Sequence, residues 1–269
     1  MHSFYIEPPV DGVAALPAGE AKHALKVLRL RPGDEVCAMD GAGRRWRGEI
    51  AEAGGGVSLR LIEELPGNEP PVRLTVYQGL PKADKLDLIV QKLTELGAAR
   101  LVPVRMERCV VKLDAKDGDK RRERLQKIAR EAAKQCGRSR PLDVLAPMDW
   151  REAVDDMRGR ELLLIPWEEA RGVRIRDAFA GRPDARDIGV VIGPEGGISP
   201  EEIARMEAAG EQDETKRAAL TQAFRLAEAA HRAFAADLEE QLCYQATPIR
   251  TLVRVQLACG LLVAERLKG

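Results

Sequence analysis

The stretch "VVIGPEGGISPEE", residues 190–202, runs from an apolar, β-branched segment through a glycine-rich turn into a helix start. The apolar residues suit a central strand of a parallel sheet, because such strands are buried on both faces. Ser199, followed by Pro200 and by Glu202 three residues after the serine, has the spacing of a capping box with proline at the first helical position. This stretch therefore predicts a strand, a loop and a helix, with the loop at the carboxyl end of the strand, where ligands of open α/β sheets bind.

The glycines of this loop are compatible with two interpretations. Gly193, Gly196 and Gly197 lack a Cβ atom, so the backbone can take a positive φ and approach a bound molecule closely. The same glycines would also serve a tight strand-to-helix connection that binds nothing. The loop is neither a Walker phosphate loop nor a G-x-G-x-x-G dinucleotide fingerprint.

Strands and helices alternate on both sides of this loop along the chain. Apolar strand-like runs at 72–80, 100–106, 161–169 and 188–192 are separated by helical patterns, two of which end at Gly97 and Gly137. That alternation is typical of an α/β domain with a parallel sheet covered on both faces. Residues 1–72 show short alternating runs instead, and predict a small β-barrel with one helix at about residues 20–30. The linker falls at residues 65–71, which hold Gly67, Asn68 and two prolines.

Composition narrows the class of protein. The 269 residues are 45% hydrophobic and 32% charged, which is typical of a globular chain with room for two domains. No apolar run reaches the length of a membrane span, and the start of the chain does not resemble a signal peptide, so we expect a cytoplasmic protein without a membrane partner. Five scattered cysteines and three histidines indicate neither a disulfide framework nor a metal site.

Charge is balanced overall and uneven locally. Residues 82–140 hold 17 Lys and Arg against 9 Asp and Glu, an excess of 8 positive charges. This distribution is compatible with a nucleic-acid-binding face and equally with the solvated surface of an ordinary helix.

Five segments together resemble the RsmE family, the SPOUT-class methyltransferases that modify N3 of a uridine in small-subunit ribosomal RNA. They are "HALKVLRLRPGDEV" with "DGAG", "KADKLDLIVQKLTELG", "ERC" at 107–109, "EAAKQCGRSRP" and "IGPEGGISPEEI". The resemblance covers about residues 1–210 in order. It implies an N-terminal PUA-like β-barrel at 1–70 and a C-terminal SPOUT (α/β knot) methyltransferase domain at 73–269.

The resemblance also implies a cofactor, a substrate and site residues. The cofactor would be S-adenosyl-L-methionine and the partner 16S rRNA or the small ribosomal subunit. Arg108 and Arg138, expected to be exposed, are the candidates for stabilising a uracil anion and for phosphate contacts, with surface salt bridges as the alternative. The positions implied for cofactor binding are Ile165, Pro166, Glu168, Ile192, Gly193, Gly196 and Gly197. The positions implied for RNA binding are Arg29, Lys82 and Lys85.

Residues 211–269 depart from the family. They lack the L-G-x-x-[IV]-L-R-x-E-T-A segment that closes the cofactor pocket and completes the knot in that family. Residues 216–241 instead read as an amphipathic helix, whose apolar stripe at 220–242 favours a partner surface and, with the family's dimers in view, predicts a homodimer. Two functions stay open at this point: the methyltransferase, and a non-catalytic RNA-binding protein with an incomplete cofactor pocket.

Overall fold

The computed structural model describes residues 1–53, 56–82, 85–111, 115–167 and 175–211. The chain divides into two units. The first comprises residues 1–69 together with 129–141, and the second comprises 70–128 and the chain from residue 142 onward. Residues 129–141 thus belong to the first unit, although the domain that the sequence predicts ends at residue 70. The sequence does not reveal this, because a helical pattern does not show which unit a stretch of helix packs on.

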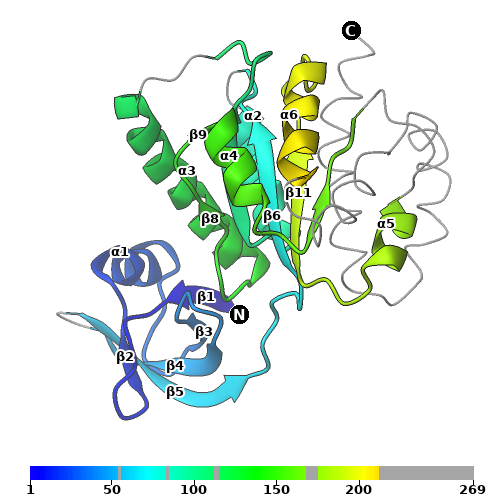
Figure 1. The fold of residues 1–269 in the computed structure, drawn as a ribbon. Coiled ribbons are helices and arrows are strands. Elements are labelled where there is room, and N and C mark those ends of the chain that lie inside the picture. Colours follow the sequence, from blue (N-terminus) through cyan, green and yellow to red (C-terminus); the bar gives the residue numbers. More distant parts are fainter. Residues whose placement is uncertain (54–55, 83–84, 112–114, 168–174, 212–269) are drawn as a thin grey trace, which may run out of the picture. The chain divides into compact units, whose positions relative to one another are not determined.

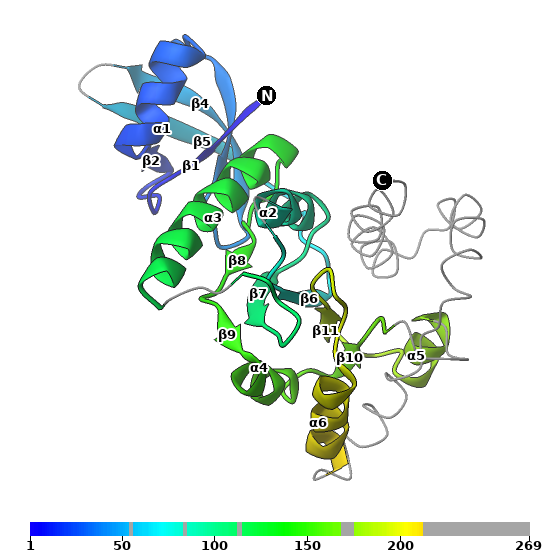
Figure 2. The same ribbon diagram turned by 90° about the horizontal axis from the view of Figure 1, so that it is seen from above.

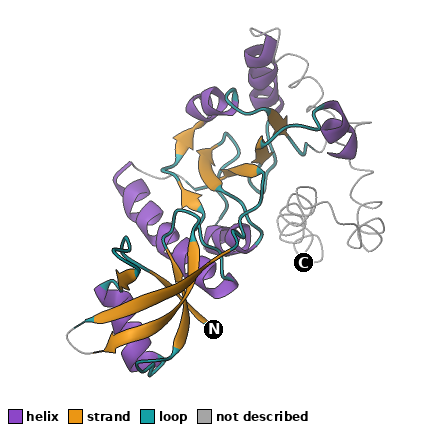
Figure 3. Ribbon diagram, turned by 90° about the horizontal axis from the view of Figure 1, so that it is seen from below, coloured by secondary structure: helices purple, strands orange, loops and turns teal. Residues whose placement is uncertain are grey.

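A five-stranded sheet forms the first unit (Figures 1 and 3). Its strands, in the spatial order β1-β3-β4-β5-β2, are β1 (His2–Tyr5), β3 (Glu35–Met39), β4 (Arg45–Ala53), β5 (Val57–Leu65) and β2 (Val13–Ala15). The backbone N–H of Glu7, just beyond β1, donates to Ala15 O of the opposite edge strand at 3.0 Å, which brings the two edges of the sheet together. The small β domain that the sequence predicts at the amino end of the chain is confirmed as a five-stranded sheet.

Alternation explains how these strands build a core. In β4, Trp46, Gly48 and Ile50 are buried while Arg47 and Glu49, which alternate with them, are only half-buried, as the two-residue period of a strand requires. Trp46 and Ile50 pack with Phe4, Val36 and Leu59 in one apolar cluster.

The predicted helix at 20–30 is shorter and less regular than expected. It consists of α1 (Ala18–Lys22) and a π-helical turn, η1 (His23–Val27). Arg29, at φ 56, takes the left-handed conformation just beyond it, which a continuing α-helix does not allow.

A parallel sheet forms the second unit, as predicted. Its spatial order is β10-β11-β6-β7-β8, with β9 also paired to β7. The strands are β6 (Arg73–Gly79), β7 (Arg100–Arg105), β8 (Asp143–Val144), β9 (Met148–Asp149), β10 (Leu162–Leu164) and β11 (Asp187–Ile192). The helices are α2 (Lys85–Glu95), α3 (Ala115–Cys136, of which 115–128 belong here), α4 (Trp150–Met157), α5 (Ile175–Gly181) and α6 (Pro200–Glu211). Sequence patterns did not predict the two-residue strands, α4 or α5.

Helices cover both faces of this sheet. Figure 2 shows α2 on one side of β6 and β7, and α4 and α6 on the other. On the α4 and α6 side, Tyr77, Val102 and Val191 of the strands pack against Trp150 of α4 and Ile203 of α6. Among the described residues, none of the helices combines the length and the apolar composition that a membrane crossing requires.

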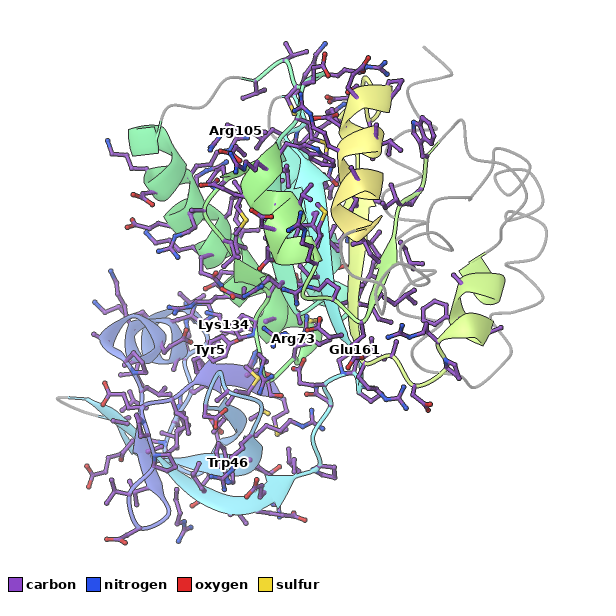
Figure 4. All side chains as sticks on the ribbon, viewed as in Figure 1. Tyr5, Trp46, Arg73, Arg105, Lys134 and Glu161 are labelled. Carbon is purple, nitrogen blue, oxygen red and sulfur yellow. The ribbon has the colours of Figure 1, made fainter. Side chains whose placement is uncertain are left out.

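A network of polar side chains lies near the amino-terminal ends of the strands, the end of the sheet where Arg73 and Glu161 are labelled in Figure 4. The Tyr77 hydroxyl donates to Asp156 Oδ2 at 2.5 Å, and Arg160 donates to both carboxylate oxygens of Asp187 at 2.9 and 3.0 Å. Burial raises the pKa of Tyr77, so the phenol stays a donor. These hydrogen bonds hold the amino-terminal ends of the strands in place. Arg105 lies at the opposite, carboxyl-terminal ends of the strands (Figure 4).

Candidate functional site

The strand order places a switch point between β6 and β11. β6 is the first strand of this sheet in the chain, and it lies between β7 on one side and β11 on the other. The chain therefore leaves β6 toward one edge of the sheet and returns later on the other side. Ligands of open parallel sheets bind at such a point, outside the carboxyl ends of the strands. The loop at 193–199 follows β11 directly and stands at this position.

The start of α6 is a capping box, as the sequence predicts. Ser199 N donates to Glu202 Oε2 at 3.1 Å, and Glu202 N donates to Ser199 Oγ at 3.2 Å. Pro200 is the first helical residue. Ser199 is 2% exposed and Glu202 is 3% exposed, so both polar side chains must be paired within the protein.

Glu107, in the turn after β7, completes the pairing of this box. Its backbone N–H donates to Glu202 Oε1 at 2.8 Å, and its Oε2 accepts from the Ser199 hydroxyl at 2.7 Å. The "ERC" segment and the "ISPEE" segment, almost one hundred residues apart in the chain, are thus a single hydrogen-bonded cluster. Sequence spacing alone could not reveal this contact.

Arg108 binds the loop itself. Its Nη1 donates to Gly196 O at 2.9 Å, while the residue as a whole is exposed. A guanidinium has five N–H donors, and one is used here. Arg108 therefore combines a fixed position beside the loop with a positive charge at the surface of the unit.

Glu195 ties the same loop to the turn between β6 and α2. Its Oε1 accepts from Lys82 N at 3.0 Å and from Lys85 Nζ at 3.1 Å. Burial acts to raise the pKa of Glu195, but the two hydrogen bonds outweigh it and hold that pKa below its usual value. Lys82 is exposed, whereas Lys85, expected to contact RNA, is half-buried and paired with Glu195.

The glycines of the loop have reasons internal to the protein. A Cβ at Gly193 would lie 2.9 Å from the carbonyl carbon of Gly197, and one at Gly196 would lie 3.1 Å from Arg108 Cβ. Gly197 has a φ of +75°, which glycine adopts without strain. A Cβ at Gly79, at the end of β6, would lie 2.6 Å from Pro194. The tight turn and its packing thus account for these glycines before any ligand is considered.

The carboxyl end of β10 adds apolar walls and one donor. Ile165 is completely buried, and Pro166 and Trp167 are half-buried. The indole N–H of Trp167 is shielded from solvent and has no hydrogen-bond partner among the residues that the structure describes. Ile192 ends the neighbouring strand β11. Glu168, the remaining cofactor-binding candidate, lies outside the described residues.

Arg138 does not have the exposure that the sequence interpretation assumed. It belongs to the first unit and is 6% exposed. Its Nη2 lies 2.6 Å from Glu69 Oε2, and its Nε donates to the same oxygen at 3.2 Å. The expectation of an exposed arginine is wrong because Glu69, within the predicted linker, supplies a carboxylate that charge counting along 82–140 does not include. Arg29, also in the first unit, is exposed as a phosphate contact requires.

Sequence reasoning missed three contributors to the site: Gln78, whose Nε2 donates to Gly193 O at 3.3 Å, Glu195, and Ser199 in its role as a partner of Glu107. A polar residue at the end of an apolar strand is the signal that could have singled out Gln78. The described residues hold no cluster of three or more His, Cys, Asp or Glu side chains arranged to bind a metal ion. Burial raises the pKa of the Cys109 thiol, which donates to Val104 O and is therefore a structural group.

The two units define a class of protein, and comparison with known families agrees with it. Residues 68–214 match the RNA methyltransferase domain family, and residues 16–61 match the RNA methyltransferase PUA domain family. The fold is thus that of a SPOUT-class RNA methyltransferase with an N-terminal PUA-like sheet.

Relatives identify the family within this class. The ribosomal RNA small subunit methyltransferase E of Mycobacterium tuberculosis is 35% identical over 216 residues, which are 77% of this chain and 80% of the relative. The protein of the same name from Bacillus subtilis is 34% identical over 218 residues, covering 77% of this chain and 85% of the relative. The chain belongs to the ribosomal RNA small subunit methyltransferase E family.

Solved structures of similar fold include two with the cofactor bound. The Neisseria gonorrhoeae ribosomal RNA small subunit methyltransferase E, bound to S-adenosyl methionine, superposes with a TM-score of 0.68 at 29% identity, covering 78% of this chain and 86% of that one. A Legionella pneumophila methyltransferase in complex with the same cofactor gives a TM-score of 0.67 at 26% identity, covering 77% and 86%.

Proposed function

We propose that this protein uses S-adenosylmethionine to methylate N3 of a uridine in the 16S rRNA of the small ribosomal subunit. One observation carries the proposal. At the switch point of the parallel sheet, the glycine loop after β11 and the Glu107–Arg108 turn after β7 form one hydrogen-bonded cluster that presents an exposed guanidinium. Family membership and the two relatives with bound cofactor support the chemistry assigned to this cluster.

The residues at the sheet edge fit S-adenosylmethionine. An adenosine needs apolar walls and hydrogen bonds to the edge of its base, and Ile165, Pro166 and the shielded indole N–H of Trp167 supply both kinds of group. We assign the backbone of Ile192, Gly193, Gly196 and Gly197 to the same molecule. When bound, the cofactor supplies an electrophilic methyl group.

Arg108 carries the chemical role in this proposal. Uracil N3 bears a proton at neutral pH and becomes an effective nucleophile only as that proton leaves, so a site that favours the reaction stabilises the developing anion. The guanidinium of Arg108 carries a positive charge and is fixed through Gly196 O. A positioned cation of this kind needs no reorganisation during the reaction.

RNA binding in this proposal involves both units. Arg29 of the first unit and Lys82 of the second are exposed cations suited to phosphate contacts, which add affinity that depends on salt and not on sequence. Lys85 acts through Glu195 instead. A cytoplasmic location and a homodimer remain part of the proposal.

The test measures binding and product separately. Calorimetry gives the dissociation constant for S-adenosylmethionine, and digestion with mass spectrometry identifies 3-methyluridine in 16S rRNA incubated free or within unmodified small subunits. Arg108→Met should lower kcat about 100-fold, the usual loss when one stabilising donor is removed. Arg105→Met is the matched control, since Arg105 is the last residue of β7, three residues before Arg108, and donates to Pro147 O instead. Equal kcat values for the two variants would overturn the role of Arg108.

A second function is favoured by one observation. The match to the methyltransferase family ends at residue 214, and the remaining residues do not contain the family's pocket-closing segment. A protein that binds 16S rRNA and shows no cofactor binding at millimolar concentration would be the non-catalytic RNA-binding protein.

A further inference from the structure

We infer that Gln78 is a positioning residue for the loop at 193–197, which it holds through the carbonyl of Gly193. The inference rests on the proposed function for the identity of the cofactor. The contact itself is independent of the proposed function: Gln78 Nε2 donates to Gly193 O at 3.3 Å and to Gly79 O at 3.0 Å.

Gln78 stands where two strands separate. The parallel ladder between β6 and β11 ends at the pair Gln78 and Ile192. Beyond it, β6 turns into the connection to α2 and β11 turns into the glycine loop. The carboxamide of Gln78 donates to the carbonyl of the residue that follows each member of this last pair, Gly79 and Gly193, and so extends the hydrogen bonding by one step where the β6–β11 ladder stops.

Burial makes this contact consequential. Gln78 is 3% exposed, so water cannot replace the two carbonyls as the hydrogen-bond acceptors of its carboxamide. An apolar side chain of the same length would leave both carbonyls without this donor, and the loss of a hydrogen bond in a buried or partly buried place costs free energy. The loop would then relieve the loss by moving Gly193.

Gly193 is the residue that sets where the loop starts. The other ties act further along, at Glu195 through Lys82 and Lys85 and at Gly196 through Arg108. Pro194 lies against Gly79 with no space for a Cβ, so the start of the loop is close to β6 as well. Gln78 is therefore the single side chain among the described residues that donates a hydrogen bond to the first residue of the loop.

The experiment compares Gln78→Met with Gln126→Met in the full chain. Gln126 is a matched control in the same unit, because its carboxamide also bridges backbone groups, donating to Leu142 O at 2.8 Å and accepting from Val144 N at 2.9 Å, away from the loop. Both variants are measured for thermal midpoint, for amide hydrogen exchange of residues 193–198 without cofactor, and for S-adenosylmethionine affinity.

We expect both variants to lower the thermal midpoint and only Gln78→Met to change the loop. Exchange at the Gly197 amide, which donates to Pro194 O, should accelerate about tenfold, and the dissociation constant for S-adenosylmethionine should rise about tenfold. The KM for the cofactor should rise while the KM for RNA stays unchanged.

Unchanged loop exchange in Gln78→Met, or an equal change in Gln126→Met, would overturn the inference whether or not cofactor binds. Faster loop exchange in a protein whose wild type binds no S-adenosylmethionine would support Gln78 as a positioning residue and refute the proposed function. The two failures are thereby distinguishable.

Discussion

Replacing Arg138 by methionine decides between two roles for this residue. The sequence interpretation makes Arg138 an exposed contact to RNA, whereas the structure buries it against Glu69. Methionine keeps the apolar length of the side chain and removes its charge and donors. The variant therefore tests the ion pair more than the packing.

The structure sets the magnitude. The side chains of Arg138 and Glu69 are 7% and 20% exposed, so removing one charge leaves the other in a poorly solvated place. Breaking a buried pair costs about 3–5 kcal/mol. Glu69 Oε1 still accepts from Arg140 N at 2.8 Å and from Ser139 Oγ at 3.2 Å, which reduces the loss. We expect the free energy of unfolding of the first unit to fall by about 2–3 kcal/mol.

Urea denaturation measures this loss for the first unit alone when unfolding is monitored by the hydrogen exchange of peptides from β3, β4 and β5. Glu64→Gln is the control, because the Arg44–Glu64 pair is exposed and should contribute nothing measurable. RNA affinity should be unchanged in folded Arg138→Met. The reasoning fails if stability falls by less than about 1 kcal/mol while the salt slope of RNA binding drops by about one, the signature of a lost phosphate contact.

Three further predictions follow from the site and the C-terminal segment. The pKa of Glu195 is held below its ordinary value of 4.5. The stabilisation that Glu195 gives the loop should therefore be fully present above pH 4.5 and disappear as the pH falls through the pKa of the folded state. Hydrogen exchange at 193–198 should show this acid dependence, and Glu195→Gln should abolish the dependence. Ser199→Ala should lower the free energy of unfolding by about 1–2 kcal/mol, since it removes a helix cap and a partner of Glu107; urea denaturation with no change would contradict the cluster. Light scattering should show a homodimer, and Phe224→Glu combined with Phe234→Glu should give a monomer or an unfolded C-terminal segment; these two residues lie outside the described part of the chain.

Local sequence patterns correctly predicted the fold class and the start of α6. Alternating residues in β4, the apolar run of β11 and the Ser199–Glu202 spacing are rules of neighbouring residues, and the structure follows each of them. The short strands β8 and β9 escaped because two residues have no measurable period, and α5 escaped because its seven residues span less than two helical turns of pattern.

The sequence by itself therefore determined the longer strands and helices of the second unit, where the glycine loop lies and which motifs the chain shares with its family. Tertiary structure alone decided the partners of the charged side chains. Arg138 faces Glu69, Lys85 faces Glu195 and Arg108 faces Gly196 across separations of 69, 110 and 88 residues. The physical reason is that secondary structure depends on periodicity over a few residues, whereas a charge pairs with whatever group the folded chain brings within hydrogen-bonding distance, and no local pattern encodes that distance.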